Sequence, residues 1–332
     1  MVKKNPYRPY SPDPGFMSLW PDGVSGNDIN GVGETEVRRP DIVWWATEHD
    51  DIRFAEMQQW FYQHEPADET LMLLRQQRRD IIDAPLPDLA DNAVQQSPQD
   101  WTKSLDHFID QKICEKVGVT KLREEWVYAH HSTAFNNVIL LGIAHDYEEL
   151  SAAPTLQAGI EVTHQYCRAA AAAKQVAGWL RQKGWDAEPV TGPMVGKILM
   201  IPHALEAGFG ELGKHGSLIN PEFGSAFRLG AVLTDAPFEL TSKATHGIDD
   251  FCMNCRVCED ACPPEAIMPE KKLIRGETRW SVDFDKCIPF FAETSGCAIC
   301  IAVCPWSRPG VGMNLAEKLT RRAGRLATSS SK

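Results

Sequence analysis

Eight of the ten cysteines lie within residues 252–304, and this cluster constrains the chain more than any other feature. The first run has the spacing C-x2-C-x2-C-x3-C from Cys252 to Cys262 and is followed by Pro263. The second run starts at Cys287, has gaps of x9, x2 and x3, and is followed by Pro305. A disulfide framework would spread its cysteines along a short secreted chain, so this clustering predicts metal ligation instead.

The doubled pattern is typical of bacterial ferredoxins that bind two 4Fe-4S clusters. In such pairs the last cysteine of each run ligates the other cluster. Structural zinc is the alternative, but zinc sites usually show paired C-x2-C elements. The pattern therefore predicts two cluster ligand sets, one of Cys252, Cys255, Cys258 and Cys304, and one of Cys262, Cys287, Cys297 and Cys300.

The rest of the chain is large enough to hold an electron acceptor. A two-cluster ferredoxin needs only ~60 residues, which by domain-size reasoning leaves about 250 for another function. The net charge of −11 disfavours nucleic acid as a partner, because nucleic-acid sites need a basic surface. We see no apolar run of membrane-spanning length and no secretory or twin-arginine signal, so we expect a cytoplasmic protein without an integral membrane segment.

The order of expected elements predicts an α/β (α+β) fold. Helical patterns cover residues 66–80, 98–117 with Ser97 as N-cap, 154–183 and 195–208, and strand patterns cover 126–129, 137–144 and 227–234. We expect residues 1–125 to wrap the core and form the substrate pocket, 126–245 to form the core, 246–310 to form the cluster domain, and 311–332 to form a tail.

Three stretches together identify a family. They are TLQAGIEVTHQYCRAAAAAKQVAGWLRQKGWDAEPV, GFGELGKHGSLI with its surroundings, and the cysteine runs. Over roughly residues 130–310 the chain resembles the cobalamin-dependent reductive dehalogenases. The resemblance implies a nitroreductase-like core that binds a base-off corrinoid beside one cluster. In that family, electrons pass from the outer cluster through the inner one to cobalt, which reduces a carbon–halogen bond.

The resemblance also implies two catalytic residues. Tyr166 matches the family's proton donor, and Arg228 matches the cation that stabilises the tyrosinate. Replacement of halide by hydrogen needs two electrons and one proton, and a nearby permanent cation helps a tyrosine to release its proton. Tyr147, which follows a buried strand, is a second candidate donor. The family's further pocket asparagine has no counterpart in PVTGPMVG, which leaves substrate orientation open.

Four residues of GFGELGKHGSLI are candidate corrinoid contacts. Gly210 and Gly216 would allow the backbone to approach a large flat cofactor closely. Lys214 and His215 could contact corrin amides or the phosphate of the nucleotide tail.

The expected partners are a small organohalide substrate and a separate electron donor, which could be a ferredoxin, a flavodoxin or a reductase. The donor is expected to be separate because the chain ends about 20 residues after the clusters. Two other functions stay open. An epoxyqueuosine-reductase-like enzyme would use similar cofactors, but its tRNA substrate calls for a basic face and an acidic proton donor. A non-catalytic iron–sulfur electron-transfer protein would need neither Tyr166 nor Arg228.

Overall fold

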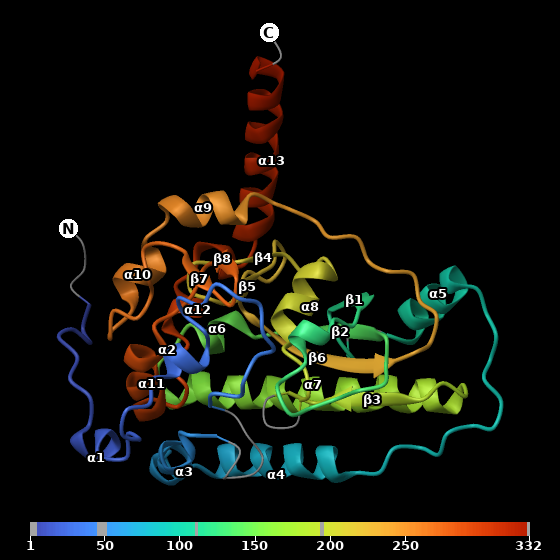
Figure 1. The fold of residues 1–332 in the computed structure, drawn as a ribbon, viewed down its shortest axis with the longest axis horizontal. Helices are drawn as coiled ribbons and strands as arrows, with labels where there is room; N and C mark the ends of the chain where they lie inside the picture. The colour runs from blue at the N-terminus through green and yellow to red at the C-terminus, as the bar shows by residue number, and fades with distance from the viewer. Residues whose placement is uncertain (1–4, 45–51, 110–111, 193–195, 331–332) are drawn as a thin grey trace.

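A four-stranded antiparallel sheet forms the centre of the fold. The computed structural model describes residues 5–44, 52–109, 112–192 and 196–330. The strand order is β1-β2-β6-β3, with bounds Lys116–Lys121, Asn137–Ala144, Phe227–Thr234 and Ala187–Val190. Beneath the sheet lies the long helix α7 (Leu156–Gln182), and α4 (Glu69–Asp83) lies beneath α7, as Figure 1 shows.

The sheet is buried on both faces, as the apolar run at 137–144 predicted. Ile139 and Leu141 point into the core that the sheet shares with α7, whereas Val138 and Leu140 pack in a second core on the opposite face. The Ala-rich centre of α7 lets the helix approach β6 closely. A Cβ placed on Gly230 of β6 would lie 2.9 Å from the carbonyl oxygen of Ala169.

The expected elements at 137–144, 154–183 and 227–234 are confirmed by β2, α7 and β6, and the Ser97 side chain accepts the predicted capping hydrogen bond. Within the described residues of the first half, the remaining helices are α1 (Pro14–Met17), α2 (Gly26–Ile29), α3 (Ala55–His64), α5 (Pro98–Phe108), η2 (Glu124–Trp126) and α6 (Tyr147–Leu150).

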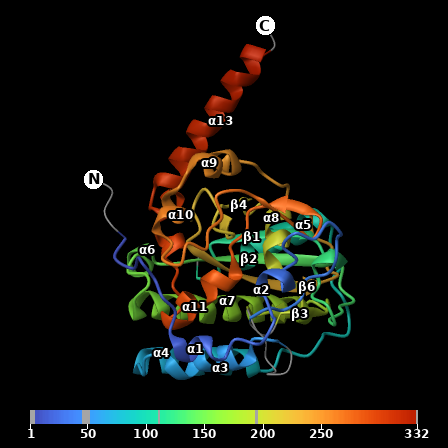
Figure 2. The ribbon, with the colours of Figure 1, turned by 60° about the vertical axis from the view of Figure 1, so that its left-hand side comes forward.

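The cysteine-rich part forms a compact module at one end of the sheet. It contains α9 (Ile248–Asn254), α10 (Val257–Ala261), the hairpin β7 (Lys272–Ile274) and β8 (Glu277–Arg279), α11 (Phe284–Glu293), α12 (Ile299–Ala302) and η3 (Pro305–Ser307). Helix α8 (Met200–Glu206) and the short pair β4 (Glu211–Leu212) and β5 (Leu218–Ile219) join it to the core. Helix α13 (Val311–Ser330) projects away from the body (Figures 1 and 2).

The N-terminal segment lies against the cluster module, far from it in sequence (Figure 2). The Arg8 guanidinium donates to the carbonyl oxygen of Cys262 at 2.6 Å, and the Ser25 hydroxyl donates to Asp285 at 2.6 Å. These bonds fix the backbone around one cysteine of the second ligand set. The N-terminal segment therefore contacts the cluster module.

The helix expected over 98–117 ends at Phe108. Cys114, which we placed in that helix, lies outside it, and residues 116–121 form β1 instead. Val117, Val119 and Thr120 are β-branched and favour a strand, and pairing with β2 satisfies the backbone. This strand ends at Lys121, before the domain boundary expected at residue 125, so the core sheet takes one strand from the N-terminal region.

No strand forms over 126–129; the chain makes the 3-10 turn η2 and one isolated bridge between Val127 and Ile198. The reason is a distant side chain. The Arg39 guanidinium donates to the carbonyl oxygens of Val127 and Tyr128, two of the backbone acceptors that a ladder would use. The helix expected over 195–208 is shorter, Met200–Glu206, and residue 195 lies outside the described residues.

Candidate cluster and cofactor site

The four cysteines expected to hold the first cluster come together at the end of the module that carries α9, α10 and η3. Burial, together with the neighbouring thiols of Cys304 and Cys255, raises the pKa of the Cys252 and Cys258 thiols to about 12. Cys304 thus lies with the first run although it ends the second. A bound iron would have to displace the protons of these thiols.

The other four cysteines form a second group. Burial raises the pKa of Cys287 and Cys297 to about 12, and the Cys262 thiol acts on both. Burial also raises the pKa of Cys300 well above its usual range, and all three other members add to the effect. Cys262 thus joins the second run although it ends the first.

The two groups have the membership expected from the spacing, and the assignment of each to a cluster stays a proposal. They are neighbours, because the Cys258 thiol also acts on Cys300. Among the residues that the structure describes, no group of three or more His, Cys, Asp or Glu could hold a metal ion. A cubane spreads its thiolates around four irons, so this finding concerns single-ion sites.

A cavity of about 770 Å³ adjoins the second group. Its wall includes all four cysteines of that group, which are Cys262, Cys287, Cys297 and Cys300. Gly210, His215 and Gly216 line the same cavity, whereas Lys214 and the first cysteine group do not. Three of the four candidate corrinoid contacts therefore share one cavity with one candidate cluster.

The glycine at 210 serves the protein's own packing. It has a φ of +128°, and an added Cβ would lie 2.0 Å from the carbonyl oxygen of Ile219. The backbone here approaches the neighbouring strand β5 more closely than any side chain allows. Gly216, with a φ of +74°, faces the Val282 side chain at 3.3 Å, also within the cavity wall.

Lys214 is engaged with the cluster module. Its ammonium lies 3.5 Å from a carboxylate oxygen of Glu259 and 5.3 Å from the ring centroid of Trp280. The side chain is only 3% exposed. This lysine therefore links the glycine-rich segment to α10.

His215 is a buried neutral histidine. The backbone N–H of Ser217 donates to Nδ1 at 3.2 Å, which leaves Nε2 to donate to the Ser225 hydroxyl at 3.1 Å. Burial lowers its pKa to about 4, which keeps the ring uncharged. Because both ring nitrogens already have protein partners, the ring lines the cavity as a part of its wall.

Tyr166 and Arg228 lie face to face, on α7 and β6. The Arg228 guanidinium carbon is 4.7 Å from the ring centroid of Tyr166. Within the described part of the chain, the buried Nε of Arg228 has no hydrogen-bond partner. Neither residue lines the cavity described above, so the structure does not bring this pair together with the candidate corrinoid contacts in that cavity. Tyr147, the other candidate donor, uses its hydroxyl to donate to the Ala302 carbonyl at 3.0 Å.

A second arginine lies beside Tyr166, and the sequence analysis did not predict it. The Arg78 guanidinium carbon, on α4, lies 5.5 Å from the Tyr166 ring centroid. The signal was available, because Leu71, Leu74, Arg75 and Arg78 follow helical i, i+3, i+4, i+7 spacing. This stripe is the less exposed side of α4. Charged residues on a core-facing stripe indicate a polar site between the helix and its neighbour.

The network behind Arg228 predicts a pH dependence of stability. Burial lowers the pKa of His145 to about 4, and although Glu161 opposes the shift, Arg228 and Arg168 add to it. An unfolded histidine has a pKa of about 6.5, so between these values only the unfolded chain binds this proton. The stability that the neutral His145 contributes to the folded state is fully present above pH ~6.5 and is lost as the pH falls towards 4.

We therefore expect the melting temperature of the wild type to fall more steeply between pH 7.5 and 5 than that of His145→Gln. Thermal unfolding at several pH values measures this. Parallel curves for the two proteins would contradict the assignment of this titration to His145.

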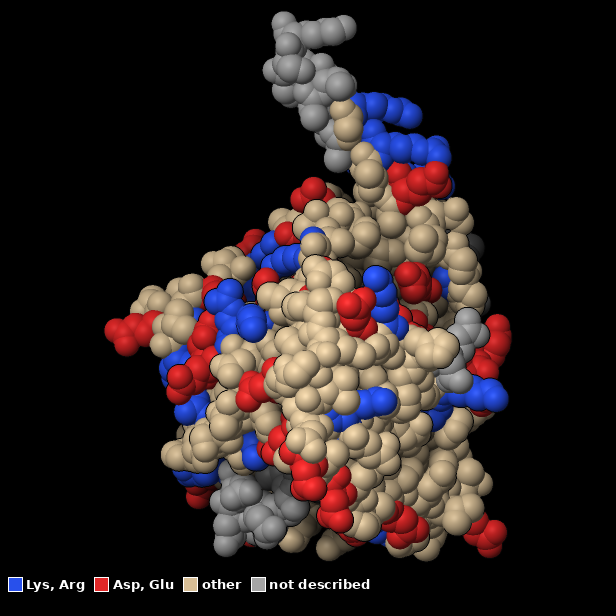
Figure 3. Space-filling model, turned by 90° about the vertical axis from the view of Figure 1, so that its right-hand side faces the viewer, with Lys and Arg blue, Asp and Glu red and all other residues tan. Residues whose placement is uncertain are grey.

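The surface carries both signs of charge. On the face in Figure 3, acidic and basic side chains are interspersed, and basic residues gather on the projecting helix. Exposed residues of α13 include Lys318, Arg321 and Arg322. Among the described residues, no helix combines the length and apolar character that crossing a membrane requires.

Comparison with known proteins gives this geometry a family context. A family model described as a 4Fe-4S dicluster domain matches residues 251–307. The tetrachloroethene reductive dehalogenase of Dehalobacter restrictus is 33% identical over 208 residues, which are 58% of this chain and 37% of that protein. The epoxyqueuosine reductase of Leadbetterella byssophila is 32% identical over 134 residues, 35% of this chain and 38% of that protein.

Solved structures share the fold. A catabolic reductive dehalogenase superposes with a TM-score of 0.71 at 22% identity, covering 83% of this chain and 43% of that one. A reductive dehalogenase studied for B12-dependent dehalogenation superposes with a TM-score of 0.64 at 24% identity, covering 75% and 38%. This chain thus spans less than half the length of these reductive dehalogenases. In sequence and in fold the chain is similar to the reductive dehalogenases, and its residues 251–307 match a 4Fe-4S dicluster domain.

Proposed function

We propose that this chain forms the catalytic part of a reductive dehalogenase, which converts R–X, two electrons and one proton into R–H and halide. One observation carries the proposal: the second cysteine group lines the same cavity as Gly210 and Gly216. A cluster held there would adjoin whatever the cavity binds. The similarity to reductive dehalogenases of known structure supports a corrinoid as that occupant.

The residues present fit these cofactors. The cavity is of a size that suits a large ligand, and the eight thiols form two buried neighbouring groups. When bound, base-off cobalamin and two 4Fe-4S clusters would supply the electrons and the centre that reduces the carbon–halogen bond. Gly210, His215 and Gly216 would form the wall facing the corrinoid.

In this proposal Tyr166 donates the proton from its hydroxyl to the carbon that loses the halide. The tyrosinate that remains carries a negative charge in a partly buried place. The guanidinium groups of Arg228 and Arg78 lie over its ring and would stabilise that charge. The buried Nε of Arg228 lacks a partner in the described structure, so it can donate one further hydrogen bond.

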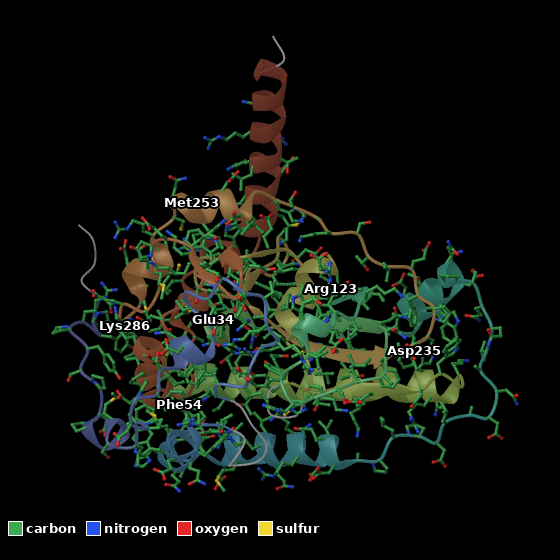
Figure 4. The ribbon with its side chains drawn as sticks, in the orientation of Figure 1. Glu34, Phe54, Arg123, Asp235, Met253 and Lys286 are labelled. Atoms are coloured by element: carbon green, nitrogen blue, oxygen red, sulfur yellow. The ribbon has the colours of Figure 1, made fainter. Side chains whose placement is uncertain are left out.

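The first cysteine group marks where electrons would enter. It does not line the cavity, and Met253 beside Cys252 is 53% exposed on α9 (Figure 4). An exposed apolar side chain next to a cluster site suits a transient contact with a redox partner. We propose a small organohalide as substrate and a ferredoxin, a flavodoxin or a reductase as electron donor.

Anaerobic reconstitution with iron, sulfide and cobalamin tests the proposal. We expect about eight irons and one corrinoid per chain, an EPR signal typical of base-off cobalt, and halide release from a reduced sample. Tetrachloroethene, named with one relative, is a suitable first probe together with halogenated aromatics. A full iron content without corrinoid binding would contradict the proposal and favour an iron–sulfur electron-transfer protein.

An epoxyqueuosine-reductase-like activity is the second candidate, since one such enzyme is 32% identical over 134 residues. The net charge of −11 opposes a tRNA substrate. The same reconstituted protein distinguishes the two activities when it is given an epoxyqueuosine-containing tRNA stem-loop in place of an organohalide. Turnover of the RNA stem-loop without turnover of an organohalide would favour this second function.

A further inference from the structure

The basic residues of the cavity wall differ in how their charge is balanced. The wall includes four cations, which are Lys243, Lys271, Arg275 and Arg279. The Lys243 ammonium lies 2.9 Å from Glu206, and the Lys271 ammonium lies 2.6 Å from Asp249. The charge of each lysine is therefore balanced by a carboxylate of the protein itself.

The two arginines, on the β7–β8 hairpin, have no such partner. Arg275 donates to the Asn30 carbonyl oxygen at 2.6 Å and forms no ion pair within 4.0 Å in the described structure. Arg279 has neither a hydrogen bond from its guanidinium nor an ion pair among the described residues. Both are only partly exposed, and Glu277, which acts on Arg279 from a greater distance, is exposed.

The two guanidinium groups also repel each other. Burial, together with the charges of Arg279 and Arg38, lowers the pKa of Arg275 to about 10, although Glu34 and Tyr128 oppose the decrease from beyond ion-pair distance. Two partly buried like charges destabilise the folded state unless an anion joins them. Guanidinium is the side-chain group best suited to bind phosphate, through paired hydrogen bonds.

We propose that Arg275 and Arg279 form an anion subsite in this cavity, which binds the phosphodiester of the cobalamin nucleotide tail. The inference rests on the proposed function, because it takes cobalamin as the occupant. The corrin side chains are neutral amides, so the phosphodiester is the one anionic group of that cofactor. Lys214 and His215, the residues first considered for this phosphate, are bound to Glu259 and to Ser217 and Ser225 instead.

The test compares two corrinoids in the chain with its clusters intact. Cobinamide has the corrin ring but lacks the phosphodiester and the nucleotide. Binding is followed by absorbance or fluorescence titration, so dehalogenation is not needed as a readout. We expect Arg279→Gln and Arg275→Gln each to weaken cobalamin binding about 10- to 100-fold and to leave cobinamide binding unchanged.

Lys271→Gln is the matched control, since it removes a cation of the same wall that is already paired with Asp249. We expect it to change the ratio of the two affinities by less than about threefold. Iron content and circular dichroism verify that each variant is folded.

Two results would overturn the subsite. Equal weakening of both corrinoids in Arg279→Gln would show a merely structural role. Unchanged cobalamin binding in both arginine variants would place the phosphodiester elsewhere. If the wild type binds neither corrinoid, the proposed function itself fails, which is distinct from a selective loss in the variants.

Discussion

Tyr166→Phe is expected to lower the rate of dehalogenation by about 10²- to 10⁴-fold, the range typical of a lost general acid. The change removes only the hydroxyl, and the ring can keep its contacts with Arg228 and Arg78. Iron and corrinoid contents should match the wild type, because Tyr166 lines neither the cavity nor a cysteine group. Halide release in single-turnover experiments with reduced protein measures the effect on the chemical step.

Tyr147→Phe is the matched control, because it also removes one tyrosine hydroxyl. That hydroxyl donates to the carbonyl oxygen of Ala302, which indicates a structural role. We expect a small loss of stability, about 1 kcal/mol, and a nearly unchanged rate. Full activity of Tyr166→Phe together with an inactive Tyr147→Phe would show that Tyr147, and not Tyr166, donates the proton.

Replacement of one cysteine in either group is expected to remove one cluster and abolish turnover. Cys258→Ser and Cys287→Ser should each retain about half of the iron, four of roughly eight atoms per chain. The crossed members provide the sharper test. Cys304→Ser should give the same residual EPR spectrum as Cys258→Ser, and Cys262→Ser the same as Cys287→Ser, because their thiols lie in those groups.

Cys114→Ser and Cys167→Ser serve as controls with the same chemical change. Both cysteines are buried outside the module, and the Cys167 thiol donates to the carbonyl oxygen of Leu74 at 3.2 Å. We expect these variants to keep all their iron. If Cys304→Ser instead resembled Cys287→Ser, each run of four would hold its own cluster, and the crossed assignment would be wrong.

Much of the core could be predicted because its determinants are local. The apolar run at 137–144 and the pattern at 227–234 each indicate a buried strand, and both strands have the expected bounds. The helix at 156–182 is rich in alanine and ends just before Gly184, whose φ is +76°. The predictions were wrong at 116–117 and 126–129, where a partner elsewhere in the chain determines the backbone: pairing with β2 in the first place and Arg39 in the second.

The cysteine spacing predicted both ligand sets, because short gaps such as C-x2-C bring the thiols of one run together within one loop, and because in the ferredoxin pattern the last cysteine of each run ligates the other cluster. It also indicated Tyr166 and Arg228 through a family resemblance, although not their distance from each other. Only the tertiary structure showed that Arg78 lies beside Tyr166 and that Arg275 and Arg279 share a cavity with Cys262 and Cys287. The spacing within α4 indicates that Arg78 faces the core, but it does not indicate the partner, which lies about 90 positions further along the chain. The cavity residues come from separate hairpins and helices, so their arrangement depends on how the layers pack.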